Sequence, residues 1–374
     1  MDGRATTDDQ VNCFLWVELN KLRAGANPAL FLDRWECKGM KLSILDQSPL
    51  VYGKSPQQAL QASVELAIRG EQLGYTRYWI AEHHDFPGLT CPAPEVMLAY
   101  VGANTSTIRI GAGAILLPHY KPYKVAESFN LLATLFPGRI DLGIGRAPGG
   151  SAEVTEALSG QFLQQVWRMP ESFEELLHFL HNDFPDDHLY ANVTASPSPA
   201  FPPTTWLLGT SGKSAKLAAD KGVAYAFGHF MSEKPGPEIV KSYIDHFQPS
   251  RKDAPETIVA VSVICAETTE RAEELAMSGL LWNLQLSKGD GRKGVPTLEE
   301  AKQYKYTEEE IKKMQHMKNK IVVGNPGEVV GRLKSLQKVY QADEIMIVSI
   351  THSYQERLRS YELISEELKK TYEK

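Results

Sequence analysis

The sequence has few cysteines, no long apolar run and no excess of basic charge, and each absence excludes a class of protein. Its four cysteines are scattered and form no CxxC pair, which argues against a disulfide framework or zinc knuckle and favours a reducing cytoplasm. No apolar stretch approaches the roughly 20 residues of a transmembrane helix. The formal net charge is −6, so we expect neither nucleic acid nor an anionic membrane as a partner.

Complete nucleotide-binding motifs are also missing. Gly209–Ser214 resembles the end of a Walker loop, but Leu207 stands where that motif needs its first glycine. The run Gly143–Pro148 fails as a dinucleotide fingerprint, because its third glycine position is a proline. No nicotinamide-binding domain is therefore evident. What remains near Ser211 is a simpler prediction: small hydroxylated residues lead into a helix N-terminus, which favours a bound anion.

What the sequence does contain is a series of short apolar segments, each followed by an amphipathic helical stretch. The predicted strands are 41–46, 77–81, 108–117, 140–144, 204–208, 223–227, 257–265 and 344–348. Eight such strands with long crossovers predict an α/β fold of the (β/α)8 TIM-barrel type, with insertions at the carboxyl-end loops. A doubly wound open sheet is the alternative, and the count of eight favours the barrel.

Two segments interrupt this organisation. Residues 1–39 lack a secretory pattern, and we expect them to be a vector-derived, upstream-translated or species-specific leader before a single domain over 40–374. Residues 284–320 are polar and contain the charged run 288–294, which predicts a mobile insertion.

Several predicted strands end in residues that suit a ligand site. One runs into Pro118 and His119, and the next ends at a glycine-rich loop that carries Arg146. Strand ends of a parallel barrel share one face, and an arginine beside backbone amides suits a phosphate or another anion. A third strand ends in the run Glu82–Asp85, which contains two histidines. Adjacent residues on a strand point to opposite faces, so we expect two unrelated roles for these histidines in place of a shared metal ion.

Four blocks in order resemble the bacterial luciferase-like flavin monooxygenase family, over about residues 40–370. The blocks are Trp79–His84, Gly111–Pro118, Phe129–Arg146 and Leu208–Gly222. No single block is specific, but their order is. Further likeness at Leu42–Asp46 and Gly149–Gly150 suggests the single-chain oxidoreductase branch.

The resemblance implies roles for individual residues. His83 corresponds to a catalytic acid/base near the flavin, and Gly113-Ala114 to a bond that is often a non-proline cis peptide beneath the flavin ring. The residues that would hold the flavin phosphate are Arg146, Thr210, Ser211 and Ser214. Residues 284–320 correspond to a mobile lid. Gly145 stands where luciferase subunits have a cysteine, so the resemblance does not extend to light emission.

These likenesses imply an FMN-dependent monooxygenase that uses reduced flavin and O2 to oxidise a small organic substrate. Because no dinucleotide fingerprint is complete, a partner reductase would supply the reduced FMN. The family also implies a homodimer through the helices after the second and third strands. Two alternatives stay open: an F420-dependent enzyme that transfers a hydride, and a non-catalytic flavin-binding barrel.

Overall fold

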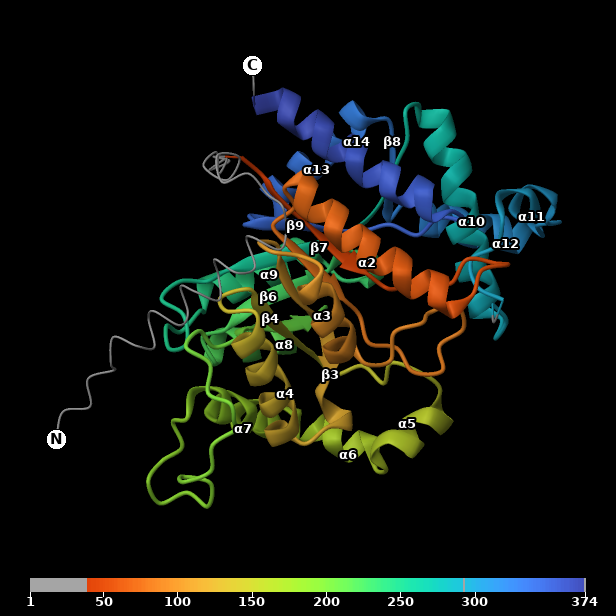
Figure 1. Cartoon of the computed structure of the whole chain (residues 1–374). Helices are drawn as coiled ribbons and strands as arrows, with labels where there is room; N and C mark the ends of the chain where they lie inside the picture. The colour runs from red at the N-terminus through yellow and green to blue at the C-terminus, as the bar shows by residue number, and fades with distance from the viewer. Residues whose placement is uncertain (1–38, 292, 373–374) are drawn as a thin grey trace. The chain divides into compact units, whose positions relative to one another are not determined.

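The parallel strands of this protein close into a barrel (Figure 1). The computed structural model describes residues 39–291 and 293–372, so the predicted leader 1–39 lies, apart from Gly39, outside the described residues. The strands are β1 (Lys41–Asp46), β2 (Arg77–Ile80), β3 (Arg109–Leu116), β4 (Ile140–Gly145), β5 (Thr204–Gly209), β6 (Ala224–Gly228), β7 (Thr257–Cys265), β8 (Ile321–Gly324) and β9 (Glu344–Val348). Their order is β6-β5-β4-β3-β2-β1-β9-β7-β8, and β6 also pairs with β7. Eight strands thus form a closed ring, which confirms the predicted (β/α)8 barrel.

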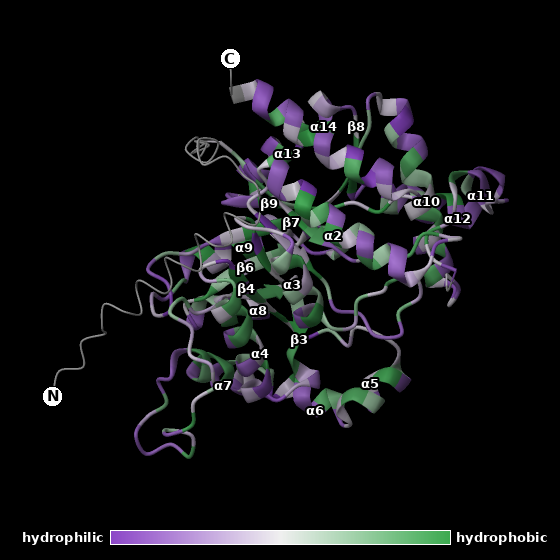
Figure 2. Cartoon of the chain, viewed as in Figure 1, coloured by the Kyte–Doolittle hydropathy of each residue, from purple (hydrophilic) through white to green (hydrophobic). Residues whose placement is uncertain are grey.

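Helices surround the barrel, and hydrophobic residues concentrate on the strands and the inner helix faces (Figure 2). The α-helices are α2 (Pro56–Leu73), α3 (Pro94–Ala103), α4 (Pro122–Leu135), α5 (Ala152–Ser159), α6 (Phe162–Trp167), α7 (Met169–His181), α8 (Gly212–Asp220), α9 (Gly236–Asp245), α10 (Thr269–Ser287), α11 (Leu298–Gln303), α12 (Glu308–Lys318), α13 (Pro326–Tyr340) and α14 (Tyr354–Tyr372). Two 3-10 turns, η2 (Leu117–His119) and η3 (His229–Met231), follow β3 and β6. Within the described ranges, no helix is both long and apolar enough to cross a membrane.

Local sequence signals explain where many helices begin and end. In α2, the Ser55 hydroxyl accepts a hydrogen bond from the Gln58 N–H, and the Gln58 side-chain oxygen accepts one from the Ser55 N–H. Pro56 supplies the fixed φ of the first turn. Gly74 ends the helix at a φ of 87°, a conformation that a side chain disfavours.

The segment 284–320, predicted as a polar, mobile insertion, contains regular helices. It completes α10 and then forms α11 and α12, which begin at the capping residues Thr297 and Thr307. After it comes β8, a strand that the sequence prediction missed, which pairs with β7 through Ser262 and Ile321. The pattern failed here because β8 has only four residues and α11 only six, too few to display a hydrophobic period.

The inward-facing residues of the barrel change character along its axis. The middle is filled by large side chains, including Trp79 and Trp206, whose ring centroids are 5.4 Å apart. Towards the carboxyl ends, most inward positions are small; they are Ala81, Gly113, Gly145, Ala226 and Ala260. A Cβ atom built on Gly113 would lie 3.1 Å from Trp79, which is tighter than ordinary contact. The barrel is therefore filled by large side chains in its middle and lined by small residues at its carboxyl end.

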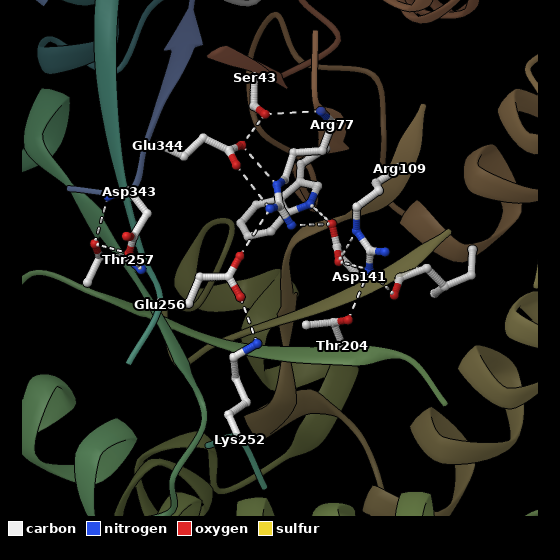
Figure 3. Close-up of polar contacts among 12 residues, drawn as sticks. Ser43, Arg77, Arg109, Asp141, Thr204, Lys252, Glu256, Thr257, Asp343 and Glu344 are labelled. Atoms are coloured by element: carbon white, nitrogen blue, oxygen red, sulfur yellow. Dashed lines mark hydrogen bonds and ion pairs between the residues drawn. The ribbon is translucent and has the colours of Figure 1, made fainter. Parts of the chain in front are cut away.

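The opposite end of the barrel is closed by a buried ionic network (Figure 3). Arg77 donates to Asp141 at 3.0 Å and to Glu344 at 2.9 Å. Asp141 also accepts from Arg109 at 2.5 Å and from the Trp79 indole at 3.0 Å. Burial alone would raise the pKa of Asp141, but the two guanidinium groups outweigh it and the pKa is lowered. These charged side chains lie at the amino ends of the strands, which form the floor of the barrel. Ligands of such barrels bind at the other end, where the strands have their carboxyl ends.

Candidate active site

The ends of β4 and β5 bring Arg146 to the start of α8. Ile144 pairs with Leu207, so Arg146, directly after β4, follows the same end of the sheet as Thr210, directly after β5. The Arg146 side chain is exposed, and no acid in the described part of the chain forms an ion pair with it. The two predicted phosphate ligands thus follow neighbouring strands at the same end of the barrel, and the described residues give Arg146 no acidic partner.

Ser211 and Ser214 build the N-terminus of α8. The Ser211 hydroxyl accepts from the Ser214 N–H at 3.3 Å, and the Ser214 hydroxyl is 3.2 Å from the Ser211 N–H. This capping box leaves the N–H groups of Gly212 and Lys213, in the first turn, without partners inside the helix. A Cβ atom at Gly209 would lie 2.3 Å from the Ser214 hydroxyl, so only glycine fits before this turn. The sequence therefore forms a cap whose free amides suit an anion.

The predicted cis peptide bond is present between Gly113 and Ala114. It lies where the register between β3 and β4 shifts, between Ala112 and Ile115. Trp79 pairs with Gly111, and Gly113 lies two residues further along β3. The cis bond therefore lies among the small inward-facing residues at the carboxyl end of the barrel.

His83 follows β2 and has a ring nitrogen without a partner. Its backbone N–H donates to the Cys91 carbonyl at 3.0 Å, and its ring packs edge-on against Phe86 with centroids 5.3 Å apart. The Nδ1 atom is buried and accepts or donates no hydrogen bond among the described residues. Burial, and secondarily the neighbouring His84, lower the pKa of His83 to about 4. The ring is therefore neutral near pH 7, beside a cavity of about 320 Å³ lined in part by Phe86, Leu89 and Thr90.

His84 has different surroundings. Its Nε2 lies 2.6 Å from Glu82, a buried carboxylate that also accepts from the Tyr120 hydroxyl at 2.8 Å and the Leu116 N–H at 3.0 Å. Glu82 therefore joins the end of β2 to η2. The sequence analysis gave Glu82 no role. The signal that could have indicated one is its position between an apolar strand and two histidines. Within 39–291 and 293–372, no group of three or more acidic, histidine or cysteine side chains is arranged to hold a metal ion.

His119 and Tyr120, which follow β3, hold neighbouring loops in place. His119 Nε2 is 2.8 Å from the Pro148 carbonyl, and its ring stacks on Phe162 with centroids 5.0 Å apart. Tyr120 is bound to Glu82 as described above. His119 thus connects β3 to the segment after β4 that carries Arg146, and Tyr120 connects β3 to the end of β2.

Comparison with known proteins agrees with this geometry. The model of the luciferase-like monooxygenase family matches residues 40–341. The chain belongs to this family. An N-acetyl-S-alkylcysteine monooxygenase from Bacillus subtilis (strain 168) is 38% identical over 330 residues, which cover 87% of this chain and 98% of that protein. The crystal structure of apo-MsnO8 is 34% identical, with a TM-score of 0.79 over 88% of this chain and 99% of that one.

Two more distant structures share the barrel fold. The oxygenating constituent of 3,6-diketocamphane monooxygenase from Pseudomonas putida, in complex with FMN, is 19% identical, with a TM-score of 0.62 over 88% of this chain and 98% of that one. An F420-dependent secondary alcohol dehydrogenase is 14% identical, with a TM-score of 0.61 over 87% and 97%. The protein is therefore an enzyme of a family whose fold accommodates a flavin or a deazaflavin.

Proposed function

We propose that this protein is an FMN-dependent monooxygenase that uses reduced flavin and O2 to oxidise a small organic substrate. The observation that carries the proposal is the exposed Arg146 at the end of β4, without an ion pair among the described residues, next to the strand that leads into the N-terminus of α8. When bound there, reduced FMN supplies the electrons that activate O2. The remaining steps depend on what the protein's own residues hold, orient and exclude.

The residues present fit FMN. A phosphate at the start of α8 would meet the Arg146 guanidinium, the Thr210 and Ser211 side chains and the free amides of the first helical turn. Ser214 would act chiefly by fixing the Ser211 backbone. The flat ring system would lie over the small residues at the carboxyl end, with Gly113-Ala114 beneath it.

His83 would hold or move a proton at its buried, unpartnered Nδ1. Because its lowered pKa keeps the imidazole neutral near pH 7, it can accept a proton from the substrate or the cofactor at that atom. This supports His83 as the catalytic residue.

Titration of the purified protein with FMN and with riboflavin tests the phosphate site. Losing a charge-assisted hydrogen bond costs about 1.5–3 kcal/mol, so Arg146→Gln should weaken FMN binding roughly 10- to 100-fold. Riboflavin, which lacks the phosphate, should bind both proteins alike. Arg168→Gln removes an equal charge from another exposed position and serves as the control. Equal FMN affinity in wild type and Arg146→Gln would remove the basis of the proposal.

The reaction is tested by anaerobic reduction of the FMN complex and mixing with air-saturated buffer. An N-acetyl-S-alkylcysteine is the first substrate to try, because a relative is named for that activity. Oxygenated product, found by mass spectrometry with 18O2, supports a monooxygenase. F420 reduction coupled to an alcohol without O2 would instead support the deazaflavin alternative, favoured by the fold shared with an F420-dependent dehydrogenase. Equal flavin binding by wild type and His83→Ala, with no turnover by either, would indicate a flavin-binding protein.

Two partners and a location complete the proposal. A separate reductase would deliver reduced FMN, because the glycine-rich segments lack a dinucleotide fingerprint. A homodimer would form through α3 and α4, whose outer faces expose the large apolar side chains Val96, Tyr100, Leu131 and Leu135. The scattered cysteines favour a cytoplasmic location.

A further inference from the structure

A second cavity, of about 320 Å³, lies next to β8 and α13. Its polar lining comes from His229, Asn319, Lys320 and Arg332, and its apolar lining includes Ile321 and Leu336. None of these residues belongs to the site proposed for the flavin. The cavity is large enough for a small organic group.

The strand register places this cavity at the carboxyl end of the barrel. β6 pairs with β7 as far as Ala260, and β8 pairs with β7 from Ser262 onward. β9 pairs with one edge of β7, including Ser262. β6 and β8 therefore lie end to end along the opposite edge of β7. His229 comes directly after β6 and Lys320 directly before β8, so both lie at the gap between these strands.

The cavity is also close to the proposed phosphate site along the barrel wall. β5 and β6 are neighbours, with Gly209 paired to Phe227. Thr210 therefore leaves β5 beside the residue that ends β6. A Cβ atom built on that residue, Gly228, would lie 3.5 Å from Thr210 Cγ2. Adjacent strand ends thus carry the α8 site and His229.

The cations of the cavity are only partly compensated. Arg332 is exposed, and no acid in the described residues forms an ion pair with it. Lys320 pairs with Glu233, which itself does not line the cavity. His229 Nδ1 lies 2.8 Å from the Tyr340 hydroxyl. A hydroxyl that donates to Nδ1 leaves the imidazole proton on Nε2, which then becomes a donor.

The one acid that lines the cavity has other partners. The Glu328 carboxylate accepts from the Thr269 hydroxyl at 2.6 Å and from the Asn325 N–H at 3.2 Å, in the cap of α13. Burial, followed by the charges of Arg332 and Lys320, lowers the pKa of His229 and keeps its ring neutral. The lining therefore carries two cations, Lys320 and Arg332, and one carboxylate, whose oxygens are held in the helix cap, with an aliphatic wall at Ile321 and Leu336.

We propose that this cavity binds the oxyanion of the substrate, a carboxylate or a group of similar shape and charge. Arg332 provides the charge, with Lys320, His229 and Asn319 as further donors, and the apolar part of the substrate contacts Ile321 and Leu336. The inference rests on the proposed function, since it names the substrate class of that enzyme as organic acids. The same chemistry would also fit an acidic tail on a deazaflavin cofactor.

Isothermal titration of the full-length protein separates these possibilities. The probes are N-acetyl-S-methylcysteine, its neutral methyl ester, FMN and F420. The proteins are wild type, Arg332→Gln, Arg332→Lys and the control Lys338→Gln, which removes a charge from an exposed position of α13 that does not line the cavity. We expect wild type to bind the acid at least about tenfold more tightly than the ester. Arg332→Gln should lose this preference, whereas Arg332→Lys should retain part of it and Lys338→Gln all of it.

Three results would overturn the proposal. The first is equal binding of acid and ester by wild type. The second is a preference for the acid that survives Arg332→Gln. The third is a tenfold loss of F420 affinity in Arg332→Gln with unchanged acid binding, which would assign the oxyanion to the cofactor. FMN affinity should be the same in wild type and Arg332→Gln. If wild type fails to bind FMN, the proposed function fails, and the acid and ester titrations still test the cavity.

Discussion

Replacing Arg77 with methionine should destabilise the barrel by removing the cation at the centre of its floor. The side chain is 5% exposed and contacts Asp141, Glu344 and, at 3.3 Å, Glu256. In the variant, Asp141 would still have Arg109 and the Trp79 indole, but Glu344 would keep, among the described residues, only the Ser43 hydroxyl as a side-chain partner. Breaking a buried ion pair in this way costs about 3–5 kcal/mol of unfolding free energy.

Urea denaturation followed by far-UV circular dichroism measures this loss. Arg69→Met serves as the control: Arg69 pairs with Glu362 and is 40% exposed, so its loss should cost less than about 1 kcal/mol. The double variant Arg77→Met/Glu344→Gln should recover part of the stability, because it also removes the stranded carboxylate. A cost for Arg77→Met no larger than that of Arg69→Met would refute the reasoning.

The same network makes the stability of the folded protein depend on pH. Its arginines lower the pKa of Asp141, so the ion pair contributes stability above the ordinary value of 3.8 and loses it as the pH falls further, through the lowered folded-state pKa. Without Arg77 the pKa of Asp141 should rise, and acid unfolding of the variant should begin at a higher pH. FMN affinity at neutral pH should not change, since the floor and the mouth lie at opposite ends.

Three further outcomes test the mouth of the barrel and its outer face. His83→Gln should reduce turnover at least about 100-fold with little change in FMN affinity. Because the pKa of His83 is about 4, wild type should lose stability as the pH falls from 6.5 towards 4; melting temperatures of His83→Gln that show the same loss would contradict this assignment. Gly145→Leu should abolish FMN binding in a fluorescence titration, because a Cβ atom there already lies 3.1 Å from Ala114; normal binding would show that the ring lies elsewhere. Leu131→Asp should give a monomer by light scattering, and an unchanged mass would exclude α4 from the dimer interface.

The sequence was sufficient to predict the barrel and the cis peptide bond at Gly113-Ala114, whereas the roles of the predicted site residues stay predictions. Strong apolar periods with Gly and Pro boundaries, as around α2, specify elements that need no distant partner to be recognised. That Arg146 and the start of α8 follow the same end of the barrel was also predictable, because parallel neighbouring strands necessarily end on the same face.

Only the tertiary structure decided the features that depend on contacts between distant segments. β8 is four residues long and becomes a strand because the edge of β7 beyond β6 offers unpaired backbone groups. The different surroundings of His83 and His84 arise from Glu82, Tyr120 and Cys91, which reach them from separate segments. The cavity at Arg332 exists for the same reason: a gap between strand ends has no counterpart in local sequence. The hydrophobic periodicity of a sequence indicates whether a segment is a helix or a strand and which face of it is apolar. The burial, pKa and charge compensation of a side chain depend instead on what the rest of the chain packs against that segment.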